Sequence, residues 1–182
     1  MPNFNLLIIL VFLVGVITIL SIFTIVKIGV AKNFDRQKII KYEMRFLLIA
    51  YAVALFVLII IARGRRTDGL MFFIPFEDIY EIIKNKYPWN YDNRILLNLV
   101  NVALFIPFGL LAREVFQKKK VFALLSGLFF SITLELIQLI TQLGVFDVND
   151  IIYNTLGTLA GIGIFALYTK ICNKIGNNNL EA

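Results

Sequence analysis

The sequence predicts an all-α protein, a polytopic bundle of about five membrane-spanning helices that together form one membrane domain. Of its 182 residues, 59% are hydrophobic and only 16% are charged, a more apolar balance than soluble domains show. Several apolar stretches approach or exceed the roughly 20 residues that a helix needs to cross a bilayer. No polar segment is long enough to form a separate soluble domain.

The first apolar stretch carries no charge and lacks the basic start and small-residue cleavage site of a signal peptide, so we expect it to be a retained span. A basic segment separates it from the second stretch, which ends at the arginine-rich "RGRRTDG". A long loop follows, and we expect one short amphipathic helix in it after Pro75. The short turns "REVFQKKK" and "GVFDVND" separate the last three apolar stretches. The five predicted spans are 4–26, 46–62, 95–112, 121–143 and 151–168.

This order divides the membrane domain into four consecutive parts. They are two N-terminal spans over 1–62, a loop over 63–94, a core membrane region over 95–170 and a polar tail over 171–182. With five spans, twelve of the 18 Lys and Arg residues fall on the side of the tail. Because cytoplasmic loops are enriched in Lys and Arg, we expect the N-terminus outside and the C-terminus inside. The basic inner loops are then expected to touch anionic lipid.

The amino-acid composition excludes several kinds of catalytic and metal-binding site. The chain has no His and a single Cys, Cys172. Ser-His-Asp catalysis, Cys-His catalysis and His-ligated zinc are therefore excluded, as is an intramolecular disulfide. No metal site, cofactor or nucleic-acid partner is predicted. Any bound metal would have to use carboxylates and carbonyls, as Mg²⁺ and Ca²⁺ do.

A carboxyl group in the middle of the fourth span, Glu135, is the most unusual feature, because a charge facing lipid is penalised by roughly 3 kcal/mol on insertion scales. At 1.5 Å per residue it lies about 20 Å from the inner end of its helix, so we place it in the outer part of the core, facing the bundle. Its expected partners are Asn side chains or the arginines of "RGRR". Other polar residues are expected at the same depth, on three helices and one turn: Asn98, Asn101, Gln138, Asp147, Asp150 and Asn154.

Simpler interpretations exist for most of these residues. The amides are equally suited to hydrogen bonds between helices. Asp147 suits the N-cap of the fifth span, and Asp150 suits its first turn, where the helix dipole favours an acid. Gly157 and Gly161 form a pair typical of close helix packing, and such an interface could also join copies of the chain in a homo-oligomer. Pro107 is expected to kink the third span. Glu135 fits a purely structural role least well, because a buried carboxyl needs compensation.

Three blocks in fixed order, "NLVNVALFIPFGLL", "SITLELIQ" and "FDVNDIIYNTLGTLAG", together resemble the VanZ-like membrane proteins of bacteria. The resemblance covers about 66–168, and the upstream "FFIPF" is similar to the family's Pro-Phe motif. The chain departs from it at Phe72, where many members have Asn, and it lacks the Arg that often precedes the Asp motif. The motif residues, which include Gly109, would be the positions of interest.

The family is named for a protein associated with teicoplanin resistance in Gram-positive bacteria, so the resemblance implies a multi-pass protein of the bacterial cytoplasmic membrane with a role at the envelope. We expect a non-enzymatic protein in which six residues bind the headgroup of a lipid or glycolipid: Asn98, Asn101, Glu135, Gln138, Asp150 and Asn154. One alternative is a small membrane enzyme acting on a phosphorylated lipid, with Glu135, Asp147 and Asp150 as acid and base or as Mg²⁺ ligands. Another is an oligomeric lipid transporter or flippase.

Overall fold

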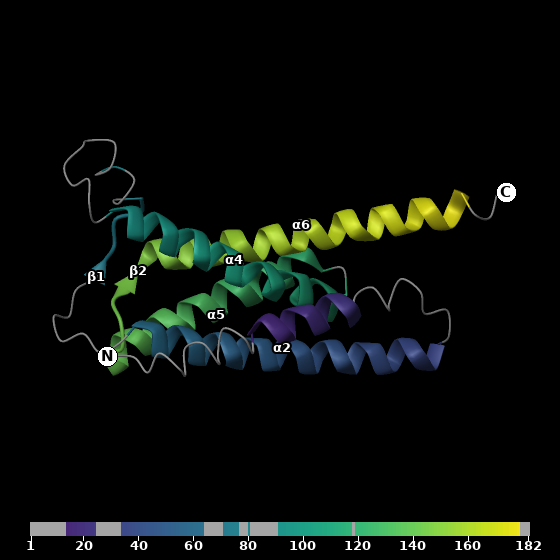
Figure 1. Cartoon of the computed structure of the whole chain (residues 1–182), viewed down its shortest axis with the longest axis horizontal. Helices are drawn as coiled ribbons and strands as arrows, with labels where there is room; N and C mark the ends of the chain where they lie inside the picture. Colours follow the sequence, from purple (N-terminus) through teal and green to yellow (C-terminus); the bar gives the residue numbers. More distant parts are fainter. Residues whose placement is uncertain are drawn as a thin grey trace.

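The computed structural model of the chain describes residues 14–24, 34–63, 71–76, 80, 91–117 and 119–178. Within this part the protein is a bundle of five helices with one small sheet at one end (Figure 1). The labelled helices are α2 (Phe34–Arg63), α4 (Tyr91–Val115), α5 (Lys120–Thr141) and α6 (Val148–Asn178). A shorter apolar helix covers Val14–Thr24. The predicted all-α class is confirmed.

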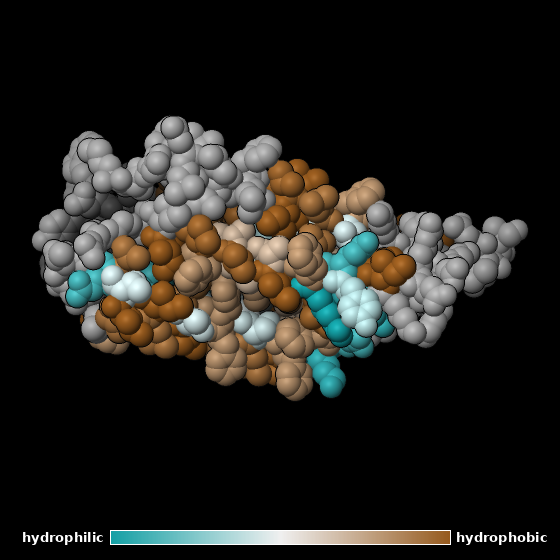
Figure 2. Space-filling model, turned by 90° about the horizontal axis from the view of Figure 1, so that it is seen from below, coloured by the Kyte–Doolittle hydropathy of each residue, from teal (hydrophilic) through white to brown (hydrophobic). Residues whose placement is uncertain are grey.

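Four of the helices are long and apolar enough to cross a membrane: Ile39–Ile60, Ile95–Val115, Lys120–Thr141 and Val148–Ile175. Their outward faces are apolar as well as their inward faces. On α2, Met44 and Leu55 are fully buried, whereas Phe46 and Ile49 are mostly exposed. A helix that is apolar on all sides fits a lipid environment. Figure 2 shows hydrophobic atoms covering most of the described surface on one side of the bundle.

Several predicted boundaries were wrong. The second span begins near Ile39 and not at 46, because α2 starts before the charged "YEMRF" and continues through it. The fifth span begins at Val148, and its helix runs on to Asn178, so most of the predicted polar tail is helical. The fourth span ends at Thr141, because the next residue, Gln142, has a left-handed backbone conformation with a φ of 56°. Of the predicted first span, residues 4–13 and 25–26 lie outside the described residues, as does most of the predicted amphipathic helix after Pro75.

A short parallel strand pair ties the long loop to the turn between α5 and α6. Strand β1 (Met71–Phe72) pairs with β2 (Phe146–Asp147), with Met71 opposite Phe146 and Phe72 opposite Asp147. Ring contact between Phe73 and Phe146, with centroids 5.5 Å apart, extends the junction. The sequence analysis did not predict this pairing, which fixes the segment carrying "FFIPF" at the end of the bundle where α6 begins (Figure 1).

Helices α4 and α6 make the most extensive contact of the bundle. They approach so closely because glycines stand at the crossing. A Cβ atom at Gly157 would collide with the carbonyl oxygen of Val102, and one at Gly161 with that of Ile106. Gly109 of α4 lies in the same way against the backbone of Thr158. The pair Gly157 and Gly161 therefore packs inside one chain and does not form a face free to join a second copy.

A side-chain hydrogen bond joins helix α2 to α4. The hydroxyl of Tyr51, a fully buried side chain, donates to the carbonyl oxygen of Leu104 at 2.8 Å. Pro107 lies inside α4 and has no N–H, so the carbonyl of Ala103, four residues earlier, has no helical donor. The Leu104 carbonyl is the next one along the chain. Helix α4 continues through Pro107 to Val115.

We predict that Gly161→Ala lowers the stability of the fold by about 1–3 kcal/mol, because the added methyl group meets backbone atoms of α4 that cannot move aside. Thermal unfolding of the detergent-solubilised protein measures the effect. Gly163→Ala is the matched control, since nothing lies within 4 Å of a Cβ at Gly163. It should be neutral or slightly stabilising, because alanine favours a helix over glycine. Equal unfolding temperatures for the two variants would contradict the close crossing.

We predict that Tyr51→Phe lowers stability by about 0.5–1.5 kcal/mol, because the hydrogen bond between the two helices is lost while the ring remains in place. Tyr42→Phe on the same helix is the control, since Tyr42 is mostly exposed. The same thermal assay compares them, and a Tyr51→Phe variant as stable as the control would show that this bond does not contribute.

Candidate functional site

A group of buried polar side chains lies between α4, α5 and α6 toward the end of the bundle that carries the small sheet. We call it the polar cluster, and it consists of Asn98, Asn101, Glu135, Gln138, Asp150 and Asn154. All six side chains are at most 9% exposed, and Gln138 is fully buried. They are the six residues that the sequence predicted to bind a ligand, and the three helices bring them into one region.

Asn101 and Asp150 form a direct polar link between α4 and α6. The Nδ2 of Asn101 donates to Oδ1 of Asp150 at 2.7 Å, and both side chains are buried. Asp150 lies in the first turn of α6, where unpaired backbone N–H groups and the helix dipole favour a negative charge. The position of Asp150 thus combines a general helix preference with a specific partner on another helix.

Glu135 receives its hydrogen bond from the backbone. Its Oε2 accepts the N–H of Asp147, on strand β2, at 2.9 Å. The side chain is 1% exposed. The sequence analysis had expected Asn side chains or the arginines of "RGRR" as partners, and the side chains of those arginines lie outside the described residues. The bond connects the middle of α5 to the turn that starts α6.

Asp147 caps α6 at its first turn. Its Oδ1 accepts the backbone N–H of Asn149 at 2.8 Å, as an N-cap residue does for the second residue of a helix. Asn149 in turn holds the long loop, because its Oδ1 accepts the N–H of Phe76 at 2.7 Å. Phe76 has a left-handed φ of 60°, which is uncommon for a residue other than glycine, and its ring meets Tyr153 edge-on at 6.3 Å. The "FFIPF" and "FDVND" segments are therefore one structural unit.

The sequence analysis did not include Ser131, although it belongs to this region. Asn154 donates from Nδ2 to the hydroxyl of Ser131 at 2.8 Å, and its backbone carbonyl accepts the hydroxyl of Thr158 at 3.0 Å. Ser131 is fully buried. Ser131 lies four residues, about one helical turn, before Glu135 on the same face of α5. This spacing is the sequence feature that could have predicted its place in the cluster.

The side-chain oxygen Oδ1 of Asn154 is among the buried polar atoms of this region that have no hydrogen-bond partner in the described part of the chain. Asn154 is 3% exposed. Because buried polar atoms in native proteins are nearly always hydrogen-bonded, this acceptor calls for an explanation. A ligand that donates from a hydroxyl or an N–H group would supply one.

The three carboxyl groups hold local structure in this conformation. Glu135 orients β2, Asp147 caps α6 and Asp150 joins α6 to α4. Within the part of the chain that the structure describes, no three His, Cys, Asp or Glu side chains lie together as metal ligands would. An acid or base role for Glu135, Asp147 or Asp150 stays a prediction.

The sequence profile of the VanZ/LLP1 family matches residues 46–169, which covers α2 from residue 46 onward, the small sheet and the whole polar cluster. The chain belongs to the VanZ/LLP1 family. It is also similar to Protein VanZ of Enterococcus faecium, with 38% identity over 79 residues. This match takes in 41% of the chain and 47% of the relative, so the chain spans about half the length of that relative. No solved structure matches the chain.

Family membership confirms the resemblance drawn from the three motif blocks and extends it toward the N-terminus. The profile begins at residue 46, where the motif blocks had suggested about residue 66, and so includes the Tyr51 contact with α4. The helix Val14–Thr24 precedes the matched region. Together with the four long apolar helices, membership identifies a VanZ-like multi-pass membrane protein.

We predict that Glu135→Gln keeps the fold and Glu135→Leu weakens it by about 1–3 kcal/mol. Glutamine retains an acceptor oxygen for the Asp147 N–H, whereas leucine leaves this backbone donor unsatisfied. Thermal unfolding in detergent distinguishes the two. Leu136→Gln on the adjacent, half-exposed position serves as a control for changes elsewhere on α5. If Glu135→Leu unfolds at the wild-type temperature, the bond to Asp147 does not hold the turn.

Proposed function

We propose that this VanZ-like protein acts at the bacterial envelope by holding the polar headgroup of an envelope lipid in its polar cluster, and that it thereby lowers susceptibility to teicoplanin and related lipoglycopeptides. The observation that carries the proposal is the buried Oδ1 of Asn154, an acceptor with no donor in the described part of the chain. Sugar hydroxyl and acetamido groups are donors of the required kind.

The neighbours of Asn154 support this assignment. Amides and carboxylates that hydrogen bonds already hold in place on three helices can recognise a hydroxyl-rich headgroup without first being ordered. Such polar groups inside a membrane bundle are costly to maintain and commonly serve function. The cluster is closed in this conformation, so the headgroup would enter by separating side chains at the sheet end of the bundle.

Apolar side chains beside the cluster suit the hydrocarbon part of the same ligand. Phe73 and Ile74 are each more than half exposed. They follow β1 directly, and Phe73 contacts the ring of Phe146 on β2. An acyl or prenyl chain lying on these residues would leave its headgroup next to the strand pair, where Glu135 is bonded to Asp147.

The test is teicoplanin susceptibility of a sensitive Gram-positive host that produces the protein, with variants compared at matched membrane levels. Wild type should raise the inhibitory concentration, and Asn154→Leu and Glu135→Gln should abolish most of that effect. Thr133→Ala is the matched control, because this exposed hydroxyl on α5 donates to the carbonyl of Phe129 in its own helix. It should protect as wild type does.

Two results would overturn the proposal. If Asn154→Leu and Glu135→Gln protect as well as wild type, the polar cluster is not the functional site. If wild type gives no protection while it is present and folded in the membrane, this family member does not have the proposed role in teicoplanin susceptibility.

A further inference from the structure

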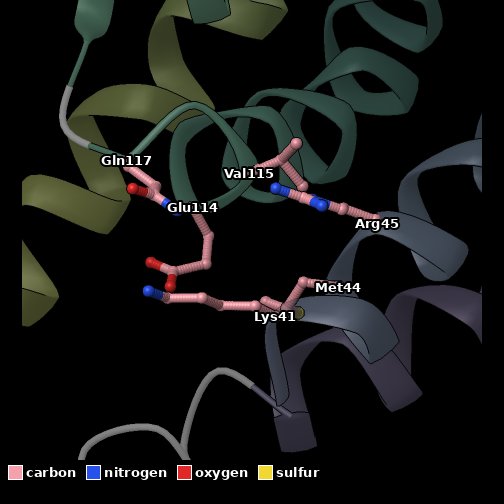
Figure 3. A pocket seen from close by; sticks show the side chains of 6 residues that line it. All are labelled: Lys41, Met44, Arg45, Glu114, Val115 and Gln117. Carbon is pink, nitrogen blue, oxygen red and sulfur yellow. The ribbon is translucent and has the colours of Figure 1, made fainter. Parts of the chain in front are cut away.

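A second polar site lies at the opposite end of the bundle from the small sheet, where α2 begins and α4 ends. It is a shallow cleft between the two helices (Figure 3), lined by Lys41, Met44, Arg45, Glu114, Val115 and Gln117. We call it the basic-end cleft. It shares no residue with the polar cluster, and its role is independent of the function proposed above.

Two cations project into this cleft from consecutive turns of α2. Lys41 and Arg45 are four residues apart and therefore share one face of the helix. Figure 3 shows Lys41 pointing toward Glu114, whereas Arg45 extends past Val115 on the other side. Arg45 also makes a cation–π contact with Tyr42, 5.9 Å from the ring centroid. The site thus presents two positive charges together with the carboxylate of Glu114.

The cleft lies at the boundary of the hydrophobic region. The apolar span of α2 begins at Ile39 and that of α4 ends at Val115, so the lining residues stand where the membrane meets water. The buried Met44 and the partly buried Val115 give the cleft an apolar floor. Lipid headgroups occupy this depth, and their acyl chains continue along the apolar helix surface.

A third positive charge, that of Arg113, lies near the same end of α4 but does not line the cleft. Arg113, one residue before Glu114, is 8% exposed, and its guanidinium lies over the ring of Phe165 at 6.0 Å. Its Nε and Nη1 have no hydrogen-bond partner in the described part of the chain.

We propose that the basic-end cleft is a binding site for the phosphate of an anionic phospholipid in the leaflet at that end. Lys41 and Arg45 contact the phosphate. Glu114 and Gln117, at the end of α4, face the headgroup beyond it and accept or donate hydrogen bonds to its hydroxyl groups. A lipid is the appropriate source of the phosphate, because a free phosphate ion would gain nothing from the apolar floor of Met44 and Val115.

The experiment is native mass spectrometry of the full chain in detergent, with phosphatidylglycerol titrated against phosphatidylcholine. We expect wild type to retain phosphatidylglycerol selectively and Lys41→Gln/Arg45→Gln to weaken that binding at least about tenfold. Phosphatidylcholine retention and the unfolding temperature should not change. Both side chains are exposed, and each single variant should show a partial loss, which provides the test if the double variant is unstable.

The matched control is Lys119→Gln/Lys120→Gln, which removes the same charge from exposed residues at the start of α5, at the same end but outside the cleft. It should bind phosphatidylglycerol as wild type does. Equal losses in the two double variants would overturn the proposal, because they would indicate general electrostatic attraction. Displacement of the lipid by inorganic phosphate at an equal concentration would also overturn it, since the site would then recognise a free anion.

Discussion

The close crossing of α4 and α6 is the constraint on which the rest of the structure depends. Glycines at the crossing let the two backbones approach without intervening side chains. Only at this separation can the short side chain of Asn101 reach Asp150 at 2.7 Å. In a membrane, where the hydrophobic effect does not drive helices together, such packing and a buried hydrogen bond are the main sources of association.

The turn before α6 also fixes the position of the loop segment that precedes α4. Asp147 pairs in the sheet with Phe72, caps α6 through Asn149 and donates its N–H to Glu135. Asn149 then fixes Phe76. A few polar atoms therefore position a strand, a helix start and a loop together, which explains why a polar motif occurs at the end of an apolar bundle.

The two ends of the bundle differ in chemistry. The sheet end buries amides and carboxylates among three helices, whereas the other end presents arginine and lysine beside an apolar floor. This asymmetry is consistent with the charge bias that the sequence shows between its loops, and it suits a protein that meets different headgroups in the two leaflets. Arg113 stands out because it carries its charge into the bundle, where no described side chain compensates Nε or Nη1.

The sequence by itself determined the membrane class, the approximate place of the long helices, the family and the depth shared by the polar residues. These follow from local properties, namely apolar run length, helical spacing and motif order. Only the tertiary structure decided which polar atoms meet: Glu135 bonds to a backbone N–H, Ser131 joins Asn154, and β1 pairs with β2. Contacts between segments far apart in the chain depend on how closely helices approach, and a single sequence does not encode that distance locally. Span boundaries were wrong for a related reason, because charged side chains at the ends of α2 and α6 do not stop a helix whose backbone bonds continue past the apolar region.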